Sequence, residues 1–197
     1  MMVLLHTCCG PCASACCPRL VRGGDRPVMF FSNSNIATEE EFEKRLEAAR
    51  TLGKADGVEV VADVYDHEDW LEKVARGLED EPERGARCAK CFRYSLERTA
   101  RYAAEHGFDA FASSLTVSPH KISQMVFAAG RDAAWTVSAA PCGGSAAPAP
   151  EFLEIDFKKQ DGFLESLRRS RELGLYRQEF CGCEFSRDDR ENNPSRG

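Results

Sequence analysis

Short apolar runs alternate with longer amphipathic stretches along most of the chain. Each short run is bounded by glycine, proline or polar residues and has the length of a β-strand. The stretches between the runs carry apolar side chains three or four positions apart, which is the spacing of one face of an α-helix. The pattern predicts strands over residues 3–6, 27–31, 58–61, 109–113 and 152–156.

Several residues mark where the predicted helices begin and end. Pro11 suits the first turn of a helix, and Thr38 with Glu41 forms a capping box. Gly53 and Gly174 follow the last apolar positions of their helices, where glycine commonly ends a helix. The predicted helices cover residues 12–22, 38–52, 66–77, 88–106, 119–129 and 161–173.

The alternation of strands and helices favours an α/β fold with a mainly parallel sheet. The first strand of such a fold is usually central, and ligands bind beyond the carboxyl ends of the strands. We expect the loops 32–35 and 113–120, which both follow strands, to face the same crevice. Residues 1–186 are predicted to form a single domain, and 187–197 a disordered tail. The Ala-, Gly- and Pro-rich stretch 139–150 is predicted to be a flexible loop.

Composition narrows the class of protein. The chain has 197 residues, of which 43% are hydrophobic and 29% charged, as in an ordinary globular domain. Its formal net charge of −6 argues against a protein that coats nucleic acid. No apolar run approaches the ~20 residues that span a membrane, and no signal peptide is recognisable, so we expect a cytoplasmic protein. Ten cysteines in such a reducing compartment indicate metal or redox chemistry.

Two adjacent cysteines, Cys8 and Cys9, stand where the first strand ends and the first helix begins. Cys12 falls on the first turn of that helix. A helix N-terminus favours the thiolate form of cysteine, which binds metals and acts as a nucleophile. The alternative is simple packing in the core, which we expect for Cys16 and Cys17 further along the helix.

A second pair, Cys88 and Cys91, has the two-residue spacing typical of metal ligands. Alone, the pair could equally be a thioredoxin-type redox motif. Together with Cys8 and Cys9 it supplies four thiolates, as a [4Fe–4S] cluster or a Cys₄ zinc site requires. Adjacent cysteines combined with a distant pair differ from the usual zinc pattern, which favours iron–sulfur.

Cys181 and Cys183 form a third group, separated by one glycine. A disulfide between them would close a small strained ring, and strained disulfides are the readily reduced, catalytic ones. The alternative is a tail with accidental cysteines, but Tyr176 nearby indicates an ordered segment. Cys142, within the predicted flexible loop, is expected to be incidental.

Basic residues gather in two places. His120 and Lys121 follow a strand-end loop, where they would contact a polar substrate or simply begin a solvated helix. Residues 157–177 hold six basic and three acidic side chains, a local net charge of +3. Such a run is usually a solvated helix face, but beside an active site it could bind phosphates.

Five motifs in a fixed order carry a resemblance to a known family. They are LHTCCGPC at 5–12, RCAKCF at 87–92, SPHK at 118–121, DFKKQDGF at 156–163 and LYRQEFCGC at 175–183. Together they resemble the QueH family of epoxyqueuosine reductases, from near the N-terminus to about residue 186. The resemblance implies a Rossmann-like, three-layer fold of the adenine-nucleotide-hydrolase-like kind. It also implies an oxidoreductase that removes the epoxide oxygen of epoxyqueuosine at the tRNA wobble position, a two-electron reduction yielding queuosine.

The resemblance also implies roles for the cysteines. The ligands of a [4Fe–4S] cluster would be, by position, Cys8, Cys9, Cys88 and Cys91. Cys181 and Cys183 would be the catalytic, redox-active pair, able to form a disulfide. An additional iron ion beside the cluster is implied as well, with Cys12, Cys181 and Cys183 as candidate ligands.

The partners implied are tRNA carrying epoxyqueuosine and a small electron-transfer protein such as ferredoxin or flavodoxin. In this hypothesis the cluster receives single electrons, iron polarises the epoxide C–O bond, and an acid protonates the departing oxygen. Side chains near the expected crevice would bind the substrate. These candidates are Asn33, Asn35, Lys121, Lys158, Tyr176 and Arg177.

Three other classes of protein are alternatives to this interpretation. A non-catalytic Cys₄ zinc module that binds RNA would explain four cysteines but not Cys181 and Cys183. A tRNA-thiolating enzyme would need an ATP-binding loop after the first strand, where two cysteines stand instead. A thiol-disulfide oxidoreductase using Cys88 and Cys91 would leave the N-terminal cysteines unexplained.

Overall fold

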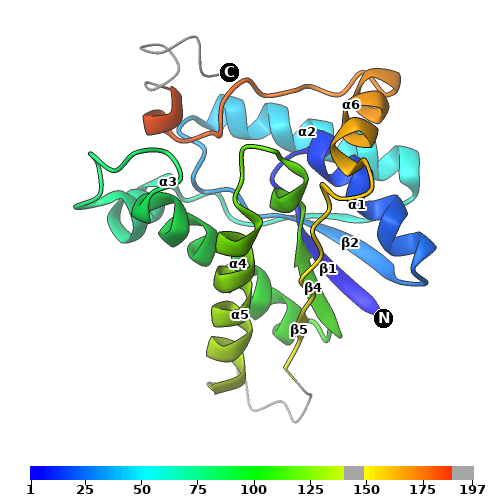
Figure 1. Cartoon of the computed structure of the whole chain (residues 1–197), viewed down its shortest axis with the longest axis horizontal. Helices are drawn as coiled ribbons and strands as arrows, with labels where there is room; N and C mark the ends of the chain where they lie inside the picture. Colours follow the sequence, from blue (N-terminus) through cyan, green and yellow to red (C-terminus); the bar gives the residue numbers. More distant parts are fainter. Residues whose placement is uncertain (140–148, 188–197) are drawn as a thin grey trace.

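A five-stranded parallel sheet lies at the centre of the computed structural model, which describes residues 1–139 and 149–187 (Figure 1). The strand order is β3-β2-β1-β4-β5, and every neighbouring pair is parallel. The strands are β1 (Met2–His6), β2 (Arg26–Phe31), β3 (Val60–Ala62), β4 (Ala110–Ser113) and β5 (Glu151–Phe152). The predicted α/β class and the central position of the first strand are therefore confirmed.

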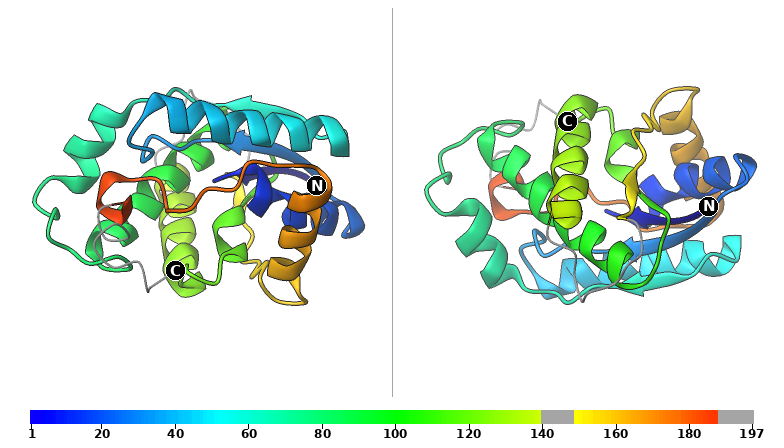
Figure 2. Two further views of the ribbon diagram at one scale, coloured as in Figure 1. Left: turned by 90° about the horizontal axis from the view of Figure 1, so that it is seen from above. Right: turned by 90° about the horizontal axis from the view of Figure 1, so that it is seen from below.

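Helices cover both faces of the sheet and complete three layers (Figure 2). The helices α4 and α5 pack on one face, and α1 and α6 pack together on the other beside α2. The α-helices are α1 (Gly10–Arg22), α2 (Glu39–Asp56), α3 (His67–Trp70), α4 (Ala86–Glu105), α5 (Ser123–Ala139) and α6 (Gly162–Glu172). A π-helical turn, Leu71–Ala75, continues α3, and a 3₁₀ turn, Ser114–Val117, follows β4.

The central strand β1 is buried on both faces, as the strands of a doubly covered parallel sheet must be. Val3 and Leu5 belong to the core beneath α1, which includes Leu20. Leu4 points to the opposite face and belongs to the core that includes Leu96 of α4. This burial fixes the register of β1, so the residues that follow it are delivered to one point at the carboxyl edge of the sheet.

The prediction that Gly53 ends the second helix is wrong. The helix α2 continues through Gly53 to Asp56, and Gly57 ends it with a φ of 66°. A Cβ on Gly53 would lie 2.6 Å from the carbonyl oxygen of Val58. Gly53 is therefore required by the close return of the chain toward β3, and Gly57 by the left-handed backbone at the helix end.

The helix predicted over 119–129 is also wrong in both bounds, because α5 spans Ser123–Ala139. Before it, the Lys121 backbone N–H donates to the carbonyl of Ser118 in a turn. The helix passes through Gly130, where a Cβ would lie 2.3 Å from the ring of Phe152. Gly130 therefore allows α5 to pack closely against Phe152 of β5.

Other predicted elements are shifted or divided. The helix predicted over 66–77 is the short α3 followed by the π-helical turn, and the third and fifth strands are shorter than predicted. The strand β5 ends at Phe152, and beyond it Thr116 Oγ1 donates a hydrogen bond to the carbonyl of Ile155. Residues 184–187 form a helical turn, one residue beyond the predicted domain boundary. Residues 140–148, with Cys142, and the rest of the predicted tail lie outside the described residues.

Within the described ranges, no helix has both the length and the apolar character needed to cross a membrane.

Candidate metal and thiol centre

The site lies at the carboxyl ends of β1 and β4, where the order of the strands reverses. The chain leaves β1 toward α1 on one face, whereas β4 leads to α5 on the other. Just beyond the two strand ends, the Cys8 backbone N–H donates to Ser114 Oγ over 3.1 Å. The Ser114 hydroxyl donates in turn to Cys8 Sγ over 3.4 Å. This switch point is where open α/β sheets bind their ligands.

Three thiols meet at this point: Cys8, Cys9 and Cys12 have sulfur atoms that all lie within 4.8 Å of one another. Cys9 is the N-cap of α1, and its Sγ accepts a hydrogen bond from the Cys12 backbone N–H at 3.5 Å. Gly10 lets α1 begin here, since a Cβ on it would lie 2.5 Å from the carbonyl oxygen of Ala48 in α2. The Cys-Cys-Gly-Pro-Cys sequence thus places three sulfurs around one helix N-terminus.

Hydrogen bonds among the three thiols shift their pKa values in opposite directions. Hydrogen bonds from the Cys12 and Cys8 thiols, together with the Cys12 backbone and Gln178, hold the pKa of Cys9 well below its usual range despite burial. The pKa of Cys12 is raised because it donates to Cys8 and Cys9 and is buried. The hydrogen bond from Cys12 lowers the pKa of Cys8, but the bond to Cys9 and burial outweigh it and raise that pKa overall. Of the three thiols, Cys9 is therefore the one that loses its proton most readily.

A second set of thiols lies at the start of α4. Cys88 and Cys91 occupy the first two turns of α4, and Cys88 Sγ accepts from the backbone N–H of Arg84 at 3.3 Å. Cys91 packs against the buried cluster that contains Cys183. The pKa of Cys91 is raised, mainly by burial and further by the charges of Cys181 and Cys183. The structure therefore groups the second and third cysteine pairs with each other.

Lys121 joins this second set from the turn before α5. Its Nζ donates to Cys181 Sγ at 2.9 Å and lies 3.4 Å from Glu83 Oε1, although the side chain is only 9% exposed. Burial lowers the pKa of Lys121, but the charges of Cys181 and Glu83 outweigh it and raise the pKa. Lys121 and Cys88 also line one small hollow. Lys121 is thus a buried cation facing the thiols.

Cys181 and Cys183, the predicted redox pair, belong to residues 174–187, here called the C-terminal segment. It follows α6 and crosses the top of the molecule beside α2 (Figures 1 and 2). Arg45 of α2, only 2% exposed, donates to the carbonyls of Cys181 at 2.9 Å and Phe180 at 3.3 Å. Tyr176 donates to Glu41 of α2, and Gln178 donates to Cys9 Sγ. The segment is therefore tied to both α2 and the first thiol group.

Similarity to known proteins identifies the family to which this chain belongs. The sequence model of the family described as "Epoxyqueuosine reductase QueH" matches residues 3–189. This chain belongs to the QueH family. The epoxyqueuosine reductase QueH of Streptococcus pyogenes serotype M1 is 35% identical over 190 residues, which cover 93% of this chain and 69% of that protein. That of Acinetobacter baylyi is 34% identical over 187 residues, covering 95% and 81%.

A solved structure shares the fold of this QueH-family chain. It is the U34-tRNA thiolase NcsA from Methanococcus maripaludis with its [4Fe-4S] cluster. The TM-score is 0.57 at 14% sequence identity, and the match covers 98% of this chain and 68% of that one. At this identity the likeness shows the three-layer fold alone, and it confirms the predicted fold class.

Family membership makes this chain an oxidoreductase of the epoxyqueuosine reductase class. The predicted family and enzyme class are confirmed, and nothing in these comparisons supports the alternative of a non-catalytic zinc module. Within residues 1–139 and 149–187, Cys8, Cys9 and Cys12 are the one group of three or more potential ligands packed so closely. All three are thiols, the donors that iron–sulfur clusters use, so the QueH-family site fits such a cofactor.

The structure gives the predicted substrate-binding residues of this QueH-family chain other partners. Asn33, 5% exposed, donates to the carbonyl of Thr7, and Lys158 Nζ donates to the carbonyl of Lys121. Asn35 is also buried, whereas Tyr176 and Arg177 are exposed. Through these hydrogen bonds, and that of Lys121 to Cys181, the three side chains hold the loops near the thiols in place. A role of Asn33, Lys121 or Lys158 in substrate binding stays a prediction.

Cys16 and Cys17 are buried in the core beneath α1, as predicted for both. Arg45 and Gln178 were missed by sequence reasoning. Arg45 stands four residues after Glu41 on a predicted helix, which is also the spacing of an ordinary surface pair. Nothing in the sequence distinguishes the buried pair from a solvated one.

Proposed function

We propose that this chain removes the epoxide oxygen from epoxyqueuosine in the wobble position of tRNA and leaves queuosine. In this reaction two C–O bonds break, one C=C bond forms, and the oxygen leaves as water after taking up two electrons and two protons. The single observation that supports this most strongly is the C-terminal segment, which carries two free thiols while its Gln178 donates a hydrogen bond to Cys9 Sγ. The segment that would carry the two-electron thiol pair is thus tied to a thiol group suited to hold a cluster.

We propose that Cys8, Cys9, Cys88 and Cys91 hold a [4Fe–4S] cluster. Support comes from the resemblance of the motifs and from the thiol group at the switch point. Cys12 is a competing ligand, because its sulfur already lies within 4.8 Å of the first two. When bound, the cluster would supply one-electron transfer from a small electron-transfer protein such as ferredoxin or flavodoxin. A neighbouring iron ion held by Cys12, Cys181 or Cys183 is part of the same proposal.

Cys181 and Cys183 match the stoichiometry of the reaction. Oxidation of the two thiols to one disulfide releases two electrons and two protons, which is what the reduction consumes. Lys121 donates a hydrogen bond to the sulfur of Cys181, and Arg45 donates to the backbone carbonyls of Phe180 and Cys181. Gly182, between the cysteines, has a φ of 131°, a conformation that a side chain would oppose. The chain therefore positions the pair without a rigid secondary-structure element.

The proposal is tested first on protein purified without oxygen. We expect about four or five irons per chain with matching sulfide, a broad band near ~400 nm, and epoxide reduction on tRNA followed by mass spectrometry. One zinc without sulfide or colour would overturn it. Cys88→Ser should lose most of the iron and the activity, whereas Cys16→Ser, a buried cysteine outside the site, should keep both. Cys12→Ser distinguishes the ligand sets, since unchanged iron content excludes Cys12.

A further inference from the structure

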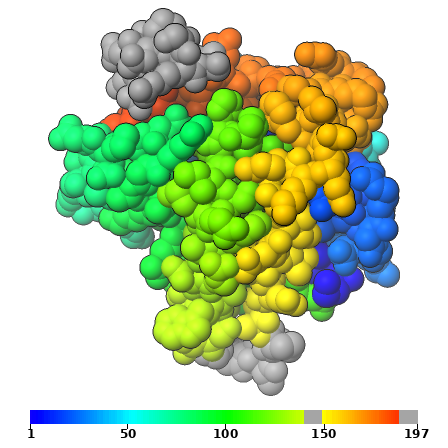
Figure 3. Space-filling view, viewed as in Figure 1, coloured from blue at the N-terminus to red at the C-terminus, as the bar shows by residue number. Residues whose placement is uncertain are grey.

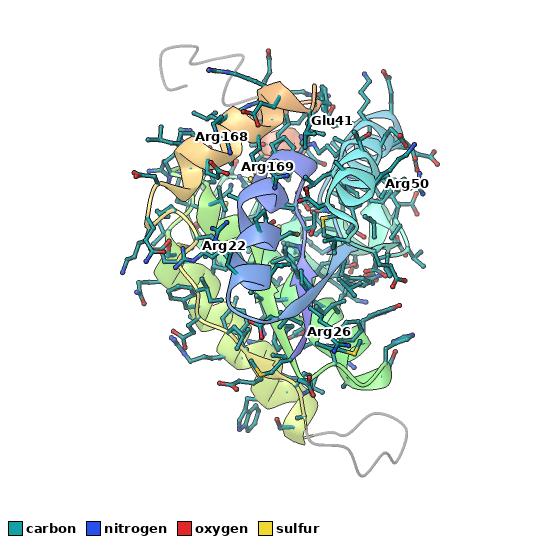
Figure 4. The ribbon with its side chains drawn as sticks, turned by 90° about the vertical axis from the view of Figure 1, so that its right-hand side faces the viewer. Arg22, Arg26, Glu41, Arg50, Arg168 and Arg169 are labelled. Atoms are coloured by element: carbon teal, nitrogen blue, oxygen red, sulfur yellow. The ribbon has the colours of Figure 1, made fainter. Side chains whose placement is uncertain are left out.

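A basic face lies on the side of the molecule where α1 and α6 pack together. The segments 19–26 and 156–179 hold nine basic and six acidic residues, a net charge of +3 in a chain of −6. The two regions adjoin at the right-hand edge of the space-filling view (Figure 3). Seen from that side, Arg168, Arg169, Arg22 and Arg26 follow one another down the face (Figure 4). We call these two segments the α1–α6 face.

Ion pairs on this face leave an excess of unpaired cations. Arg168 is bound by Glu165 and Glu172, and Arg169 by Asp56. Within the described part of the chain, five exposed cations of the face have no side-chain hydrogen bond or salt bridge. They are Arg22, Arg26, Lys159, Arg171 and Arg177. The acids without a salt bridge are fewer, namely Asp156, Asp161 and Glu179. A partner of the face must therefore be anionic.

The face is also hollowed. A surface hollow of about 430 Å³ lies between the end of α1 and the start of α6. Arg22 and Arg168 line it, together with Gln160, Leu164 and the carboxylates of Asp161 and Glu165. Its mixed walls suit a contact with the edge of a large ligand rather than the capture of a small free anion.

The unpaired cations span the molecule from the thiols to the opposite edge of the sheet. Arg177 precedes Cys181 by four residues, and Arg171 lies in the last turn of α6. Arg22 ends α1, whose 13 residues extend about 20 Å from the cap at Cys9. Arg26 pairs with Met2 at the amino end of β1. A single nucleotide cannot contact both ends of this row, whereas a polynucleotide carries negative charge along its whole length.

We propose that the α1–α6 face binds the phosphate backbone of the tRNA substrate, away from the nucleotide that reacts at the thiols. The inference rests on the proposed function for the identity of the RNA. Phosphate contacts of this kind fix the register of a nucleic acid on a protein without reading its bases. Four of the five unpaired cations are arginines, the side chain best suited to phosphate.

An acidic electron-transfer protein is the other anionic macromolecule to consider. Such a protein has to approach the cluster closely, so it would dock over the thiols at the carboxyl edge of the sheet. Arg22 and Arg26 lie at the opposite edge. The length of the row therefore favours RNA.

The test is binding of an unmodified tRNA transcript to the anaerobically purified holoenzyme, measured by fluorescence polarisation at several salt concentrations. Arg22→Ala with Arg171→Ala should weaken binding about tenfold and reduce the slope of log affinity against log salt by between about one and two. The matched control is Arg101→Ala on α4, an exposed arginine on another face, which should change neither quantity. Thermal melts of all variants confirm that they fold.

Unchanged tRNA affinity in the double variant would overturn the inference. So would unchanged affinity accompanied by slower reduction of the enzyme by a ferredoxin or flavodoxin, because the face would then serve the electron donor. The measurement uses RNA without the epoxide, so it is independent of the chemistry. Failure of the wild-type enzyme to reduce epoxyqueuosine would count against the proposed function alone.

Discussion

The ammonium nitrogen of Lys121 lies 2.9 Å from the sulfur of Cys181, although the two residues are 60 positions apart. Lys121 comes from the turn before α5, and Cys181 from the C-terminal segment. A buried ammonium needs polar partners, and here it has the carboxylate of Glu83 and the sulfur of Cys181. The contact therefore joins the proposed redox pair to the rigid part of the fold.

Replacing Lys121 with Met should slow epoxide reduction by about ten- to a hundredfold. A charge-assisted hydrogen bond contributes about 1.5–3 kcal/mol, and the variant loses it while keeping the volume of the side chain. Turnover on modified tRNA, with the melting temperature as a control for folding, measures the effect. Lys121→Arg should recover part of the rate, and full turnover in Lys121→Met would exclude the role.

Arg45 should matter for stability more than any exposed arginine. Arg45→Met leaves Glu41 without its cation, though still bonded to Tyr176, and leaves the carbonyls of Cys181 and Phe180 without their donor. Breaking a buried pair on one side costs about 3–5 kcal/mol, so we expect that loss in the free energy of unfolding in urea. Hydrogen exchange should accelerate in the C-terminal segment.

A neighbouring pair provides the comparison. Lys44 and Glu40 make a salt bridge one residue earlier on α2, but both side chains are mostly exposed. Lys44→Met should therefore cost no more than about 1 kcal/mol. Equal losses in the two variants would mean that the burial of Arg45 is not what makes it important.

The fold could be predicted from the sequence more completely than the bounds of its elements. The apolar residues of β1 and the glycines and prolines around it indicated a central strand that ends shortly before Cys8. Gly53 was misread, because a glycine at a close contact and a glycine at a helix end look the same in one sequence. The difference depends on what packs against the position, here the carbonyl of Val58, and that is a property of the folded chain.

Gly10→Ala should disturb the thiol group as well as the fold. Its Cβ would meet the backbone oxygen of Ala48, which cannot rotate away, so α1 must shift relative to α2. We expect a loss of several kcal/mol, about the cost of overpacking a core, and reduced iron content after reconstitution. Gly24→Ala, at a φ of 87° with open space around it, should cost only about 1 kcal/mol and keep the iron. Normal iron in Gly10→Ala would show that the thiol group tolerates the shift.

The two tryptophans give a direct view of the second thiol set. Trp70 is 1% exposed and packs with Cys183 and Cys91, whereas Trp135 is 73% exposed. With Trp135→Phe, the remaining emission should be blue-shifted and strongly quenched when the cofactor is loaded. With Trp70→Phe, the remaining emission should be red-shifted and quenched less. Equal quenching in the two variants would place the cofactor away from Cys91.

The sequence pointed to the cysteines of the candidate site but not to the side chains that hold them in place. Motif spacing drew attention to Cys8, Cys9, Cys88 and Cys91, because metal chemistry requires such side chains in groups. The structure brings Cys8 and Cys9 together with Cys12, and a ligand role for Cys88 and Cys91 stays a prediction. The partner of Lys121 could not be inferred, since a lysine in a strand-end loop is usually solvated. Only the folded chain shows that the C-terminal segment returns to cover it.

The return of the C-terminal segment has a consequence for the order of events during synthesis. Cys8 and Cys9 leave the ribosome first, but Gln178 and Cys181 follow roughly ten to thirty seconds later at typical translation speeds. The central strand β1 also waits for β4, its neighbour on one side. The first thiols are therefore exposed to free metal and oxidant while the rest of the chain is made, and cofactor insertion has an open entrance until the last residues dock.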